Sequence, residues 1–163
     1  MRVIKLSLIS IVILFIVITL ISALIPSQVR ISRVIDLDAS RERVYPFLAQ
    51  ISAWEGWNEY ARSFTHPRFQ VDTLNADDIR IIITGKCDSL ITANWQQPLG
   101  RSFESGYYLL STDSNHTTLQ WYFNFHLRWY PWEKFQGIIY DQQLGPPMER
   151  SLQNLQKQLA QFP

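Results

Sequence analysis

The chain has 163 residues, which is room for one domain with a substantial core and a further segment. Hydrophobic residues make up 47% and aromatic residues 13%, a composition that excludes intrinsic disorder. The formal net charge is +1 and there is no basic run, so there is no electrostatic case for nucleic acid as a partner. Cys87 is the only cysteine, and the three histidines lack the close spacing of metal ligands. We therefore expect no disulfide, no metal and no cofactor.

The first element is an apolar segment at residues 6–25, LSLISIVILFIVITLISALI, which contains no charge. A helix of this length spans about 30 Å, the thickness of the hydrocarbon core of a bilayer, so the segment predicts a transmembrane helix. A cleaved signal peptide is the alternative. The apolar run is longer than the roughly 7 to 15 residues usual in such peptides, and no A-x-A site follows it.

Positive charges on the two sides of this segment set the expected orientation. Arg2, Lys5 and the terminal amine precede it, whereas Arg30 and Arg33 follow it. The small excess before the segment favours a cytoplasmic N-terminus and a domain on the outer, periplasmic or extracellular, side. The sequence thus predicts a single-pass membrane protein with a tail at 1–5, a transmembrane helix at 6–25, a linker at 26–28 and one domain at 29–163.

The domain begins with a strand and continues with short helical segments. Residues 29–37 alternate between apolar and polar positions, as a half-buried strand does. A short helix follows, which Pro46 should kink or shorten. Trp54 and Trp57 are three residues apart and share one face of a second short helix or turn.

Three apolar runs separated by turn residues predict a set of antiparallel strands at 79–84, 89–96 and 101–112. Gly106, inside the last run, indicates a bulge. A longer strand is predicted at 117–129 because every odd position from residue 119 onward is apolar. The odd positions are Leu119, Trp121, Phe123, Phe125, Leu127 and Trp129. So long a strand should curve, and its aromatic face should line a concave apolar surface.

The C-terminal part is predicted to be a loop followed by a helix. The segment at 129–147 is mixed in character, and Pro147 is well placed for the first turn of a helix. Apolar residues then recur every three or four positions at Met148, Leu152, Leu155, Leu159 and Phe162, which form one stripe of an amphipathic helix.

The order of elements and three local motifs carry a resemblance to a known family. The motifs are ASRERV at 39–44, W-x-x-W-N at 54–58 and LGPPMERSLQNLQKQL at 144–159. From residue 29 to the end, the chain resembles the polyketide cyclase/dehydrase branch of the START and Bet v 1-like (SRPBCC) superfamily, as a membrane-anchored member. The resemblance implies the α+β helix-grip fold, in which a curved antiparallel sheet wraps around a long C-terminal helix. It also implies an apolar cavity between sheet and helix, which family members use for lipids, sterols, polyketides or other hydrophobic molecules.

Candidate ligand residues are the large apolar side chains expected on the inner surfaces of sheet and helices. They are Trp54, Trp57, Trp95, Tyr107, Trp121, Phe123, Phe125, Trp129, Tyr140, Met148 and Leu152. Aromatic rings at alternate positions of a strand share one face of the sheet, where they can line a pocket or fill it. The sequence does not decide between these two alternatives.

Three functions follow from these expectations. The first is a membrane-anchored binding domain for a hydrophobic small molecule or lipid. The second is a cyclase, dehydratase or hydrolase in which a cavity acid, Glu104 or Asp141, works with Tyr107 or Tyr140. Cys87 has no adjacent histidine in sequence, and no catalytic residue is assigned.

The third function is a structural or interaction module with a filled core. Its exposed rings would be Trp129, Tyr130 and Trp132, which, with Pro131, suit a membrane interface. The same segment could instead be a loop packed over the mouth of the cavity.

Overall fold

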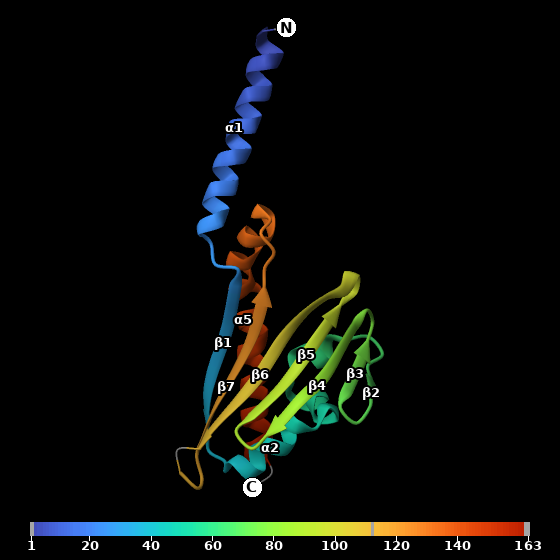
Figure 1. Ribbon diagram of the computed structural model, residues 1–163. Coiled ribbons are helices and arrows are strands. Elements are labelled where there is room, and N and C mark those ends of the chain that lie inside the picture. Colours follow the sequence, from blue (N-terminus) through green and yellow to red (C-terminus); the bar gives the residue numbers. More distant parts are fainter. Residues whose placement is uncertain (1, 112, 162–163) are drawn as a thin grey trace.

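The computed structural model describes residues 2–111 and 113–161, and it places one helix apart from an α+β domain (Figure 1). The strands are β1 (Gln28–Leu37), β2 (Arg68–Phe69), β3 (Thr73–Ala76), β4 (Ile79–Cys87), β5 (Leu90–Gln97), β6 (Arg101–Ser111) and β7 (Thr117–His126). The α-helices are α1 (Arg2–Leu24), α2 (Arg41–Ala49), α3 (Trp54–Trp57), α4 (Glu59–Ser63) and α5 (Pro131–Gln161), with short 3-10 turns at Ile51–Ala53 and Pro98–Gly100.

The strands form one antiparallel sheet in the order β1-β7-β6-β5-β4-β3-β2. β1 lies beside β7 over its whole length, from Gln28 opposite His126 to Leu37 opposite Thr117. The long helix α5 runs along one face of the sheet, in contact with β1, α3 and α4 (Figure 1). This arrangement is the helix-grip fold expected from the sequence.

The helix α1 carries the apolar segment and points away from the domain (Figure 1). Its stretch Val3–Leu24 has a mean hydropathy of 2.9 and is long and apolar enough to cross a membrane. A signal sequence near the N-terminus can meet the same criteria of length and composition. Helix α1 ends within a few residues of β1, so the domain stays close to the end of α1.

The strand predicted at 117–129 is shorter than expected, because β7 ends at His126. Its alternation is as predicted up to Phe123, with Leu119, Trp121 and Phe123 all buried. The register of β7 with β1 reaches the first residue of β1, Gln28, opposite His126, and one further backbone hydrogen bond runs from Leu127 N–H to the carbonyl of Ser27. After that bond the chain turns into α5.

The loop predicted before the last helix is wrong, because residues 131–147 are helical and continuous with the rest of α5. Pro146 and Pro147 lie inside α5 and not at its start. Each proline removes one backbone donor from the helix, so other contacts must hold the two halves in line. Arg33, in β1, contacts both halves.

The Arg33 side chain crosses α5 at the proline pair. Its guanidinium is paired with Asp141 before the prolines at 3.0 Å and with Glu149 after them at 2.6 Å. Gly145 makes this approach possible, because a Cβ there would overlap the guanidinium. These contacts join sequence-distant groups, which is why a local reading placed the helix start at Pro147.

The bulge predicted at Gly106 is also wrong. The pairing of β5 with β6 is regular through Thr92 opposite Gly106, and the irregularity in the sheet lies in β4 between Ile83 and Gly85. Gly106 instead allows the ring of Tyr122 to lie over the backbone of β6, in the space a Cβ would occupy.

Candidate ligand pocket

The space between the sheet and the middle of α5 is filled by side chains. Eight of the predicted ligand residues have at most 2% exposure and belong to one core cluster. They are Trp54, Trp57, Trp95, Tyr107, Trp121, Phe123, Met148 and Leu152. The rings touch one another, for example Tyr107 and Trp121, whose centroids are 5.3 Å apart. In this region the rings fill the space between the sheet and α5.

Hydrogen bonds hold three of the indole rings in fixed positions. Trp54 Nε1 donates to the carbonyl of Leu48, and Trp57 Nε1 donates to the carbonyl of Phe47, both at 3.0 Å. Trp95 Nε1 donates to Ser105 Oγ at 2.9 Å. The first two bonds tie α3 to the end of α2, as expected for buried indoles that have a structural role.

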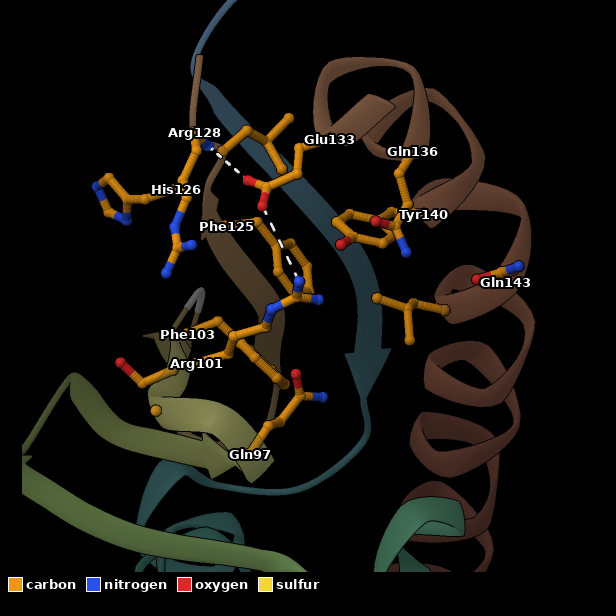
Figure 2. Close-up of a pocket in the computed structure, with 14 residues that line it drawn as sticks. Gln97, Arg101, Phe103, Phe125, His126, Arg128, Glu133, Gln136, Tyr140 and Gln143 are labelled. Atoms are coloured by element: carbon orange, nitrogen blue, oxygen red, sulfur yellow. Dashed lines mark hydrogen bonds and ion pairs between the residues drawn. The ribbon is translucent and has the colours of Figure 1, made fainter. Parts of the chain in front are cut away.

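A pocket of about 440 Å³ lies between the sheet and α5, at the end of the domain that is next to α1. It is bounded by the turn between β5 and β6, by the end of β7 and by the first half of α5 (Figure 2). Its lining residues are Gln97, Gly100, Arg101, Ser102, Phe103, Phe125, His126, Leu127, Arg128, Glu133, Gln136, Tyr140, Gln143 and Leu144. Phe125 and Tyr140 are the two predicted ligand residues among them.

Three aromatic rings form the apolar floor of this pocket. The Phe125 ring lies 4.6 Å from that of Phe103 and 4.7 Å from that of Tyr140, measured between centroids. Phe103 was not among the ligand residues predicted from the sequence. It precedes Glu104 in a predicted strand, and its side chain is expected on the same face of that strand as Tyr107. Partial burial raises the pKa of the Tyr140 hydroxyl, which is therefore neutral at physiological pH.

Charged side chains stand at one side of the pocket, where the carboxylate of Glu133 lies between the backbone of Arg128 and the side chain of Arg101. Glu133 Oε2 accepts a hydrogen bond from the backbone N–H of Arg128 at 2.8 Å, and its other oxygen lies 4.0 Å from Arg101 Nη2 (Figure 2). The Glu133 side chain is 13% exposed. Among its arginine and glutamate side chains, two arginines and one glutamate, the lining carries one positive charge in excess.

The acids proposed for catalysis do not lie in this pocket. Glu104 is exposed on the face of β6 that points away from α5, and Asp141 is paired with Arg33. Burial raises the pKa of Tyr107 well above its usual value, and its ring is enclosed by the core. The carboxylate that the pocket does contain, Glu133, was missed because it lies in the segment interpreted as a loop.

The remaining predicted residues are placed as follows. Trp129 lies outside the pocket with 67% of its surface exposed, and its ring contacts that of Tyr130 at a tilt. Cys87 is exposed at the end of β4. Within residues 2–111 and 113–161, no three histidine, cysteine or acidic side chains are grouped closely enough to hold a metal ion.

Comparison with solved structures shows the class of fold. A START superfamily protein from Mycobacterium smegmatis superposes with a TM-score of 0.60 at 15% identity, over 83% of this chain and 99% of its own. The Zhui aromatase/cyclase from Streptomyces sp. R1128 gives a TM-score of 0.58 at 11% identity, over 82% and 94%. Truncated norcoclaurine synthase from Thalictrum flavum gives 0.60 at 9% identity, over 81% and 93%.

The domain therefore has the START-like fold that these structures share. No protein-family model matches the sequence, and no curated protein does. Likeness at these identities describes the fold alone, so function has to be argued from the pocket.

Proposed function

We propose that the protein is a membrane-anchored binding protein for an amphiphilic small molecule or lipid, which it holds in the pocket between β7 and the first half of α5. The pocket is the observation that carries this proposal. Its volume of about 440 Å³ falls within the range of roughly 300 to 1,000 Å³ that small-molecule sites occupy. The same fold carries a protein named an aromatase/cyclase, which supports a small organic ligand.

The lining indicates the chemistry of the ligand. Phe103, Phe125 and Tyr140 offer a continuous aromatic floor, and apolar surface buried against it contributes about 25 cal/mol per Å². Arg101 and Arg128 outnumber Glu133, so the polar end of the ligand is expected to be anionic. A molecule with an apolar body and a carboxylate or phosphate head satisfies both parts of the pocket.

Anchorage belongs to the same proposal. Helix α1 is long and apolar enough to span a bilayer, and the excess of positive charge before it favours a cytoplasmic N-terminus. The domain would then lie on the outer face of that membrane, with the pocket at the end of the domain nearest to the lipid.

A photoactivatable fatty acid tests whether the pocket binds an amphiphile. Full-length protein in lipid nanodiscs is irradiated with a diazirine-bearing fatty acid, and the adducts are mapped by peptide mass spectrometry. We expect adducts in the segments at 97–103 and 125–144. Gln143→Trp should reduce them several-fold, because the ring would enter the pocket from α5.

Gln142→Trp is the matched control. Gln142 is the neighbouring exposed residue on α5, but it does not line the pocket. Labelling should be retained in this variant. Equal labelling in both variants, or adducts confined to α1, would overturn the proposal. Arg101→Gln should weaken labelling by the fatty acid more than labelling by its uncharged methyl ester.

A further inference from the structure

Large apolar side chains are exposed along the first turns of α5. We call Trp132, Phe135, Ile138 and Ile139 the α5 apolar face. Their spacing of three, three and one places them on one side of the helix, adjacent to the side that carries the pocket residues Gln136 and Tyr140. Trp132 is 62% exposed and Ile138 is 63% exposed.

An aromatic cluster precedes this face and continues it. The ring of Tyr130 lies 4.7 Å from that of Trp129 and 4.8 Å from that of Trp132, measured between centroids. The Tyr130 and Trp132 rings are nearly parallel, with 9° between their planes. Three rings in contact at a helix start form an amphipathic surface of the kind found at the level of lipid headgroups.

The exposed apolar surface of the domain is concentrated at this end. Outward positions further along α5 are polar or charged, including Gln142, Glu149 and Gln153. Elsewhere in the described part of the domain, the exposed large apolar side chains are three single residues on other segments: Val34, Val71 and Leu110. Scattered residues of that kind are normal on a protein surface, whereas a contiguous patch marks an interaction surface.

The end of α1 fixes where this surface lies. Lys134, which is 4% exposed, donates from Nζ to the carbonyl of Ile25 and to Ser27 Oγ, both at 2.7 Å. Helices α1 and α5 are in contact, and Ser22 in the last turn of α1 is buried. The first turns of α5 thus lie beside the segment through which α1 would leave the bilayer (Figure 1).

We propose that the α5 apolar face and the rings before it are seated in the interface of the bilayer that α1 crosses. Phe135, Ile138 and Ile139 would enter the acyl boundary, and the tryptophan rings would lie at headgroup level. Because Gln136 and Tyr140 are on the adjacent side of the same turns, the pocket would open beside the lipid surface. The ligand would then enter directly from the membrane. This inference rests on the proposed anchorage by α1.

Position-specific quenching in full-length protein tests the inference. In a Cys87→Ser background, an environment-sensitive nitrobenzoxadiazole label is attached at Ile138→Cys, at Gln153→Cys or at Leu14→Cys. Each protein is reconstituted in vesicles of phosphatidylcholine with a minor fraction of phosphatidylglycerol. Quenching is measured with doxyl-labelled lipid from within the bilayer and with iodide from the aqueous phase.

We expect the label at position 138 to be quenched several-fold more by doxyl lipid than the label at 153, and several-fold less by iodide. A label at 138 that iodide reaches as readily as it reaches 153 would overturn the inference. Protection from both quenchers would also overturn it, since a second copy or a protein partner would then cover the face. The label at 14, in the middle of α1, separates the two proposals. Loss of its lipid quenching refutes the anchorage, whereas its retention with no quenching at 138 refutes the inference alone.

Discussion

Close contact between a ring and a glycine stabilises the outer face of the sheet. Tyr122 lies on the polar side of β7 by parity, yet it is 5% exposed. Its ring covers Gly106 of β6, stacks with Tyr108 at 5.4 Å and lies under the guanidinium of Arg30 at 4.3 Å. The contact explains why a glycine, which weakens a strand, is present in the middle of β6.

Gly106→Ala should therefore destabilise the domain by about 1 to 3 kcal/mol, the usual cost of overpacking, because the new Cβ would overlap the Tyr122 ring. In a Tyr122→Ala background the same substitution should cost little, since the space is then open. Chemical denaturation in detergent micelles, followed by near-ultraviolet circular dichroism, gives the double-mutant cycle. An equal cost in both backgrounds would show that the glycine is required for another reason.

At the scale of elements, α5 combines two functions in one helix. Its second half buries Met148, Leu152, Leu155 and Leu159 in the core. Its first half forms one wall of the pocket and the α5 apolar face. The two prolines between these halves remove helical hydrogen bonds, and Arg33 bridges the break through its pairs with Asp141 and Glu149.

Arg33→Met is predicted to loosen the first half of α5 and leave the second half protected. Hydrogen exchange of the full-length protein should rise at 131–144 and stay unchanged at 148–161, which buried leucines hold in place. Because both carboxylates are more than half exposed, the cost in global stability should be only about 1 kcal/mol.

Arg30→Met is the matched control for this prediction. Arg30 is also in β1, but it contacts Asn124 and Tyr122 on the opposite face of the sheet. Its removal should leave exchange in α5 unchanged. A uniform rise along α5 in the Arg33 variant would mean that the helix moves as one rigid unit.

Elements that depend on local periodicity could be predicted from the sequence. The alternation around Trp121 and the stripe from Met148 onward placed the sheet and the final turns of α5 correctly. The first half of α5 could not be predicted, because Arg33, which bridges the proline pair, lies more than a hundred residues away from Asp141 in the sequence. The alternation along a strand predicts which face a side chain occupies, but not how deeply that side chain is buried. Trp121 in the core and Phe125 at the pocket therefore could not be distinguished from the sequence.

For the whole molecule, the pocket and the exposed rings lie at the end of the domain next to α1. The aromatic core fills the middle of the domain, and none of the residues that line the pocket beside β7 comes from α2, α3 or α4. In the proposed membrane-anchored arrangement, a domain tethered a few residues from the end of α1 cannot move far from the lipid surface. A pocket at this end is therefore in the position where a membrane-derived ligand would first meet the protein.

The proposed orientation of the protein in the membrane can be tested by labelling Cys87, the only cysteine in the chain. It is exposed at the end of β4, so a maleimide reagent can reach it without unfolding the domain. With the N-terminus in the cytoplasm, a membrane-impermeant maleimide should label Cys87 in intact cells, or in spheroplasts where an outer membrane is present. In a Cys87→Ser background, Val3→Cys at the other end of α1 should be labelled only after detergent is added. Labelling of the Val3→Cys variant but not of Cys87 in intact cells would reverse the proposed orientation, and labelled protein that alkaline carbonate extracts without α1 would identify α1 as a cleaved signal sequence.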